Sequence, residues 1–243
     1  MNPTSKYIIT HSFWRHHYEV STPNKTHLFH VANSSMTPGK PDLTFHASTD
    51  SNGPIAGVCK FRHFSSDSEI GLGSPSLPGR MEWEYLHKQG FTKRQFWFRM
   101  RLEDGSKQTF TWKRTHSLGS GYENYKLVEE GSNNVVAVFS SGSAFSKTTG
   151  SLDVYWGLGQ RFNLMALMSG LTVVERARRA RTSAAASAGG GSRGCCRRGR
   201  GLLSQDLGVS WRFVQHFDTF IVRPQQIYDF KSRENPRRCF DNF

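Results

Sequence analysis

Residues 162–181, FNLMALMSGLTVVERARRAR, decide how the rest of this chain must fold. The first thirteen are apolar except for a few small or polar side chains, which do not share one face of a helix. A helix that is apolar on all sides has to be enclosed. The run is too short to cross a bilayer, because a membrane span needs about 20 apolar residues. The sequence therefore predicts a helix over 162–181 that is buried inside protein.

Four arginines close this segment: Arg176, Arg178, Arg179 and Arg181. Cations near the C-terminus of a helix complement its macrodipole, which is one interpretation of the cluster. The other is that these arginines bind anionic lipid where the helix leaves its enclosure.

Short strands are predicted everywhere before the helix. Between residues 6 and 155, runs rich in β-branched and aromatic residues alternate with clusters of Gly, Pro, Asn, Asp and Ser, as in all-β barrels and sandwiches. About twelve strands are predicted, centred on residues 7–9, 17–20, 27–31, 42–46, 55–61, 69–72, 81–86, 96–102, 109–114, 125–128, 135–139 and 152–155. We therefore expect a mainly β domain over residues 1–181, an antiparallel barrel of about twelve strands that encloses the helix.

One hairpin can be predicted in register. Apolar and polar residues alternate along 96–102 and 109–113, so each strand has one apolar face. A two-residue turn would put the two apolar sets on opposite faces. A three-residue loop with Gly105 in the left-handed conformation pairs Phe98 with Phe110 and Phe96 with Trp112.

The opposite face of this hairpin carries the most concentrated positive charge predicted for the folded part. Its members are Arg99, Arg101, Lys107 and Lys113, with Trp97 among them. Guanidinium and ammonium groups match phosphate oxygens, and Trp97 can sit at a membrane interface. The alternative is a solvated sheet face whose charges discourage aggregation.

The sequence changes character after Arg181. Residues 182–201, TSAAASAGGGSRGCCRRGRG, are of low complexity and cannot bury enough surface to offset the entropy of ordering. We predict a largely disordered tail over 182–243. Its Arg/Gly content would suit nucleic acid, bound through phosphates without sequence preference.

No motif supports catalysis. No Gly-x-Ser-x-Gly elbow lies between a predicted strand and a predicted helix, no cysteine stands beside a base, and the Gly-Leu-Gly pairs at 71–73 and 157–159 lack the third glycine of a dinucleotide site. The cysteines, Cys59, Cys195, Cys196 and Cys239, have no zinc-site spacing. His27 and His30 are expected on opposite faces of one strand. We predict a non-catalytic protein that uses no metal and no cofactor.

The net charge of +13 favours acidic partners. The N-terminus lacks the basic region and the apolar run of a signal peptide, so we expect a cytoplasmic monomer that can be peripheral to a membrane.

Five segments carry a resemblance to a known superfamily. They are residues 40–47 (KPDLTFHA), 110–115 (FTWKRT), 124–128 (NYKLV), 135–139 (VVAVF) and 171–179 (LTVVERARR). Over residues 6–181 the chain resembles a fungal branch, of unknown function, of the tubby C-terminal-like superfamily, which includes tubby proteins, phospholipid scramblases and LURP-one-related proteins. The resemblance implies a closed barrel threaded by its C-terminal helix. It also implies phosphoinositide binding by surface Lys and Arg, although no tubby phosphoinositide motif can be laid onto these residues.

The predicted function is a binding or adaptor module for anionic phospholipid head groups, including phosphoinositides. Two alternatives stay open. One is a scramblase-like membrane protein that uses residues 162–174. The other is a protein-interaction barrel whose Arg/Gly-rich tail binds nucleic acid.

Overall fold

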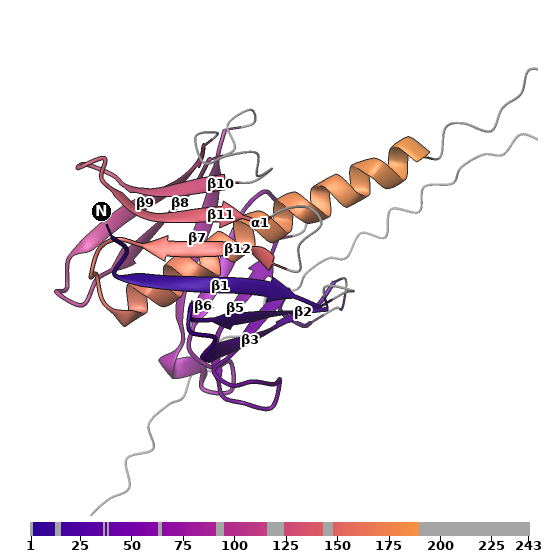
Figure 1. Cartoon of the computed structure of the whole chain (residues 1–243), viewed down its shortest axis with the longest axis horizontal. Coiled ribbons are helices and arrows are strands. Elements are labelled where there is room, and N and C mark those ends of the chain that lie inside the picture. The colour runs from indigo at the N-terminus through magenta and orange to yellow at the C-terminus, as the bar shows by residue number, and fades with distance from the viewer. Residues whose placement is uncertain are drawn as a thin grey trace, which may run out of the picture. The chain divides into compact units, whose positions relative to one another are not determined.

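A computed structural model of the chain describes residues 2–12, 16–35, 37, 39–62, 65–90, 95–115, 124–142 and 148–189 (Figure 1). The chain divides into two units, Met1–Gly194 and Cys195–Phe243. All described residues belong to the first unit.

Twelve strands and one α-helix make up the described part. The strands are β1 (Ser5–His11), β2 (His17–Ser21), β3 (His27–Asn33), β4 (Leu43–His46), β5 (Ile55–Phe61), β6 (Ser68–Leu72), β7 (Glu82–Gln89), β8 (Gln95–Arg101), β9 (Lys107–Thr115), β10 (Asn124–Glu129), β11 (Val135–Ser141) and β12 (Thr148–Val154). A 3-10 turn, η1 (Pro78–Arg80), precedes β7, and the helix α1 spans Gln160–Gly189. Every predicted run overlaps one observed strand, so the prediction of twelve strands is confirmed.

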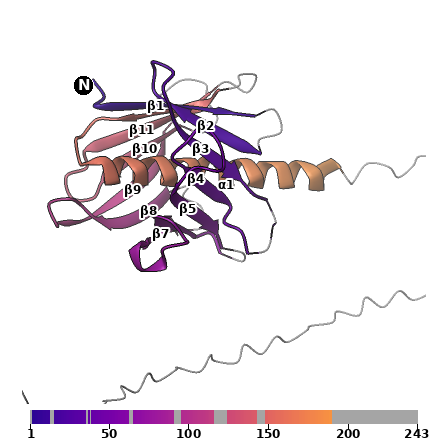
Figure 2. The ribbon, with the colours of Figure 1, turned by 90° about the horizontal axis from the view of Figure 1, so that it is seen from below.

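The strands close into a barrel. Each pairs antiparallel with its neighbour in the chain, and β1 pairs with β12 to complete the ring. Figure 2 shows α1 running lengthwise through the ring. Because closure leaves no free sheet edge, the inward side chains of all strands can pack against one helix.

The apolar part of α1 supplies the centre of the core. Phe162, Leu167 and Leu171 are completely buried, and Trp112 of β9 donates its indole N–H to the Ser169 hydroxyl at 3.0 Å. This bond satisfies two polar groups that would otherwise be costly to bury. The predicted buried helix is confirmed.

A glycine lets the helix approach the wall closely. A Cβ atom on Gly57 of β5 would lie 2.6 Å from Cε of Met168 and 2.8 Å from the carbonyl oxygen of Gly71. Both distances are shorter than van der Waals contact, so only glycine fits between the helix and the neighbouring strand.

The helix is longer than the predicted range of 162–181. It continues for eight residues past Arg181, and its last part projects beyond the barrel (Figure 1). Four of these eight residues are alanine, the strongest helix former, and the Thr182 hydroxyl donates to the carbonyl oxygen of Arg178 at 3.2 Å. The remainder of the predicted disordered tail, residues 190–243, lies outside the described residues.

The β8–β9 hairpin has the predicted register. Phe98 pairs with Phe110 and Phe96 with Trp112, while Gly105 has a φ of +83°. The backbone N–H of Leu102 donates to the Ser106 carbonyl at 2.8 Å and closes the three-residue loop. This register and this loop together place the basic side chains of the hairpin on the outside of the barrel.

Candidate anion-binding surfaces

A buried carboxylate organises the arginines of α1. Glu175 is completely buried and accepts hydrogen bonds from the Tyr18 hydroxyl, from Asn33 Nδ2 at 3.1 Å and from the guanidinium groups of Arg178 and Arg179 at 2.6–2.8 Å. Burial by itself would raise the pKa of Glu175, but the bonds from Arg178, Tyr18 and Arg179 outweigh it and hold that pKa below its usual value. Glu175 is therefore ionised and satisfied inside the barrel.

Arg179 ties this cluster to the wall. It donates to Oδ1 of Asp42 at 2.6 Å, to Oδ1 of Asn33 at 2.7 Å and to the carbonyl oxygen of Ser34 at 3.1 Å. Its guanidinium also lies 4.6 Å from the ring centre of Phe61. All of these contacts are structural, because they join α1 to three strands or their ends.

Arg176 makes a second set of contacts with the wall. Its guanidinium donates to the carbonyl oxygens of Asp67 and Ser65 at 2.5 and 2.8 Å, and to the Ser68 hydroxyl at 2.8 Å. Burial lowers the pKa of Arg176, and the nearby carboxylates of Asp42 and Asp67 act against this.

The helix-dipole interpretation of these arginines is wrong. The last turn of α1 ends at Gly189 and carries no basic residue, while dipole effects fade within one turn. Arg176 and Arg179 instead anchor the helix to the barrel wall, while Arg178 bonds to Glu175 within the helix. Arg181 lies one turn further on, at a cavity described below.

The basic residues of the β8–β9 hairpin lie together on the outside of the barrel, as predicted. Arg99 and Arg101 alternate with the buried Phe98 and Met100, and Arg101 pairs directly with Lys107 across the two strands. We call the set Arg99, Arg101, Lys107 and Lys113 the basic face. Within the described residues no carboxylate forms an ion pair with any of its members.

The basic face extends further than the sequence suggested. Lys113 pairs on its other side with Lys126 of β10. Lys107 of this face acts on the carboxyl group of Glu84: burial raises the pKa of Glu84, and the charge of Lys107 partly opposes this rise. The extension was missed because the partner strand of β9 on that side could not be assigned from the sequence.

An aromatic row adjoins the basic face. Trp97 stands 4.5 Å from His87, and His87 stacks at 5.8 Å on Tyr85, measured between ring centres. Tyr85 and Trp83 of β7 keep 46% and 41% of their surface exposed, which is high for large aromatic side chains. We call Trp83, Tyr85, His87 and Trp97 the aromatic row.

Two cations cover the far end of the aromatic row. Lys60 Nζ lies 5.0 Å from the ring centre of Trp83, and the Arg62 guanidinium lies 6.0 Å from that of Tyr85. Arg62 also forms an ion pair with Glu69 at 3.6 Å. The outer side of β5–β9 thus combines exposed rings with cations at both ends.

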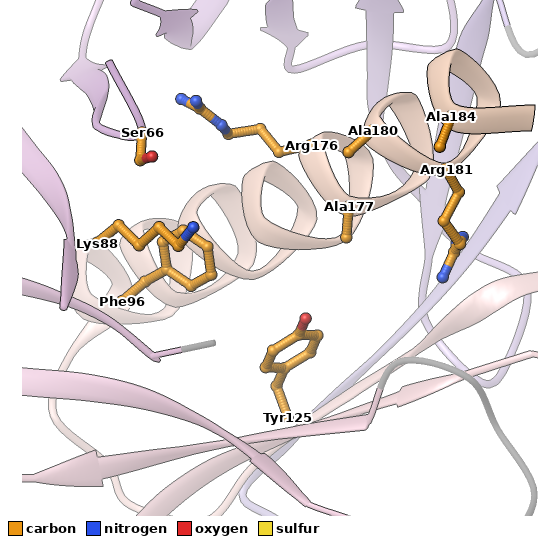
Figure 3. A pocket seen from close by; sticks show the side chains of 9 residues that line it. All are labelled: Ser66, Lys88, Phe96, Tyr125, Arg176, Ala177, Ala180, Arg181 and Ala184. Atoms are coloured by element: carbon orange, nitrogen blue, oxygen red, sulfur yellow. The ribbon is translucent and has the colours of Figure 1, made fainter. Parts of the chain in front are cut away.

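A cavity of about 510 Å³ opens where α1 leaves the barrel (Figure 3). Its lining residues are Ser66, Lys88, Phe96, Tyr125, Arg176, Ala177, Ala180, Arg181 and Ala184. Three of them are cationic and none is acidic. We call this the exit cavity.

A second cavity, of about 790 Å³, lies at the other end, beside the start of α1. It has mixed charge, since Arg161 forms an ion pair with Glu82 within its lining. The remaining charged residue of the lining is Arg80, which is exposed.

The described residues that could act as a nucleophile or as metal ligands are Cys59 and a group of histidines. Cys59 is fully buried, and burial raises the pKa of its thiol to about 12. His17, His30 and His46 lie next to one another on β2–β4, with ring centres 4.9 and 6.2 Å apart, and His46 is buried. Across the described ranges, however, no three His, Cys, Asp or Glu side chains are placed to hold a metal ion.

Comparison with family models, with curated proteins and with solved structures finds no match to this chain. A search of the described residues for a helix long and apolar enough to cross a membrane finds none.

Proposed function

We propose that this protein is a non-catalytic binding module that attaches to anionic phospholipid surfaces through the basic face and the aromatic row. We also propose that it belongs to the tubby C-terminal-like superfamily. A closed ring of twelve antiparallel strands threaded by one helix supports that membership, as does the placement of the five similar segments within it.

One observation carries the proposal: four cations lie on two adjacent strands without an ion-paired carboxylate among the described residues. Cations held this way keep their charge available for an external anion. A basic residue close to an anionic membrane contributes about 1 kcal/mol of binding free energy.

The aromatic row favours a membrane as the anionic partner. Trp and Tyr side chains partition to the level of the lipid head groups, where one end of the ring is apolar and the other wet. Trp83 and Tyr85 are the exposed members, and Lys60 and Arg62 beside them can meet head-group phosphates.

The test is co-sedimentation of the full chain with phosphatidylcholine vesicles, with and without phosphoinositide, at about 0.1 M and about 1 M salt. The Debye length falls from about 10 to about 3 Å between these concentrations, so binding should decrease sharply. Arg99→Glu/Arg101→Glu/Lys113→Glu should weaken binding by about 100-fold or more, since three contributions of about 1 kcal/mol are lost.

A matched control is Lys25→Glu/Lys40→Glu/Arg80→Glu, which changes net charge equally at exposed positions outside the basic face. Equal loss in both triple variants would mean that net charge, and not this face, drives binding. A further variant with Gln at Arg193, Arg197, Arg198 and Arg200 measures the contribution of the Arg/Gly segment. Binding of single-stranded RNA that is lost only in this last variant would favour the nucleic-acid alternative.

A further inference from the structure

We propose that the exit cavity binds a single-chain amphipathic anion, a carboxylate or phosphate monoester that carries an apolar body. This site lies inside the barrel mouth and is separate from the basic face on the outer wall. Its occupation therefore does not depend on membrane binding.

The position of Lys88 is the first reason to expect an anion in the exit cavity. This residue lies two residues after the buried Leu86, on the core-facing side of β7, and pairs across the strands with Phe96. Lysine is rarely placed on such a face unless a carboxylate accompanies it. Among the described residues no carboxylate pairs with the Lys88 ammonium.

The nearest candidate carboxylate is already engaged. Asp67 accepts the backbone N–H of Lys88 at 3.0 Å with one oxygen and contacts His87 Nδ1 at 3.2 Å with the other. Asp67 thus fixes the backbone of Lys88 and does not line the cavity. The ammonium is left facing a space in which the other charges are also positive.

The helix supplies the opposite wall. Ala177, Ala180 and Ala184 recur at the spacing of one helix face, so this side of α1 is apolar and has room beside it. Arg176 and Arg181 flank the alanines (Figure 3). Larger residues at these three positions would fill the cavity.

Tyr125 and Phe96 complete the lining. Tyr125 is 1% exposed, and its hydroxyl points from β10 toward the helix at Ala177 (Figure 3). A tyrosine hydroxyl can donate to an anion. The cavity therefore combines apolar walls with the unpaired ammonium of Lys88, and its volume falls within the usual range of about 300–1,000 Å³ for small-ligand sites.

Isothermal titration of the full chain tests this site with decanoate, decyl phosphate and 1-decanol below their micellar concentrations. We expect one molecule of either anion per chain and at least about tenfold weaker binding of decanol, because the cations select charge. Binding of decanoate but not of decyl phosphate would identify a carboxylate site. Binding of decyl phosphate but not of decanoate would identify a phosphate site. Equal binding of decanol, or many molecules per chain, would overturn the proposal.

Variants locate the site. Lys88→Gln should weaken anion binding at least about tenfold, and Ala180→Leu should abolish it by filling the space. Lys40→Gln, at an exposed lysine that does not line the cavity, is the control and should bind like the wild type.

Circular dichroism checks that each variant is folded. If Ala180→Leu does not fold, Ala184→Leu at the outer edge provides the same test. Unchanged binding in both Lys88→Gln and a folded filling variant would place the ligand elsewhere and overturn the proposal. Because vesicle binding is measured separately with the basic-face variants, failure of one proposal leaves the other intact.

Discussion

Arg179 on the threaded helix donates to Oδ1 of Asp42, 137 positions earlier in the chain, at 2.6 Å. This pair connects α1 to the residue just before β4. Since Arg179 also bonds to Glu175 and Asn33, its guanidinium is the centre of a network that holds the helix in the barrel.

Loss of Arg179 should destabilise the barrel strongly. Arg179→Met keeps the unbranched aliphatic stem but removes the guanidinium, so Glu175 and Asp42 each lose a partner. Breaking a buried pair from one side costs about 3–5 kcal/mol, which corresponds to a fall in Tm of roughly 6–20 °C for a chain of this size. Thermal denaturation measures the effect. Arg101→Met, at an exposed position, should shift Tm little, and an equal shift in both variants would contradict this role.

Glu175 should make stability depend on acid pH. Its folded-state pKa lies below that of the unfolded chain, so its contribution is complete above the unfolded value of about 4.5. The contribution is lost as pH falls from there through the folded pKa. Glu175→Gln should lower stability at pH 7 and flatten the acid limb of a plot of unfolding free energy against pH. Parallel curves for wild type and variant would argue against a depressed pKa.

His30 should make stability depend on pH in a range closer to neutral. Burial first, and then the charges of His17 and His46, lower the pKa of His30. The unfolded chain therefore binds a proton before the folded chain does, and stability decreases as pH falls through about 6.5 toward the lower folded value. His30→Gln should reduce this decrease, as measured by urea denaturation between pH 7 and the onset of the Glu175 effect. His11→Gln serves as the control outside the cluster.

Gly57 should tolerate no side chain. In Gly57→Ala the added methyl group meets Met168 and the Gly71 carbonyl, and overpacking of this kind costs about 1–3 kcal/mol. Gly79→Ala is the matched control, because a Cβ atom there meets nothing within 4 Å. Similar denaturation midpoints for the two variants would mean that the helix is not packed closely against β5.

Lys126 should contribute to vesicle binding if the basic face does. Lys126→Glu places a carboxylate directly opposite Lys113, and we expect at least about a fivefold loss of affinity for phosphoinositide vesicles. Lys40→Glu, with the same change of charge, should lose less. Equal losses of affinity in the two variants would mean that only the net charge of the protein matters, and not the position of Lys126.

Alternation of apolar residues was enough to predict the strands and the hairpin register, because a slip of one residue would have turned Phe98 and Phe110 to opposite faces. The enclosed helix could be predicted because residues 162–174 have no polar side. The end of the helix could not, since the alanines after Arg181 are compatible with either a helix or a low-complexity tail.

The candidate sites were predictable only in part. The basic face follows from local alternation, so its members were found. Glu175 stands four positions before Arg179, a local spacing that allows their bond, but the partners of Arg176 and Arg179 on the barrel wall lie more than 100 positions away, and nothing local indicates those. Lys88 left a signal, because it shares a face with Leu86 and so had to point inward. A binding role for Lys88 could be inferred only after the structure showed the cavity beside it.

The order of the elements has a consequence for synthesis of the chain. All twelve strands precede α1, so they leave the ribosome before the residues that fill the barrel exist. A ring closed without the helix would enclose an apolar void. The nascent strands must therefore remain open, with their inner faces uncovered, until Glu175 and Arg179 arrive. During that interval these faces offer a binding surface for a chaperone that recognises exposed apolar strands.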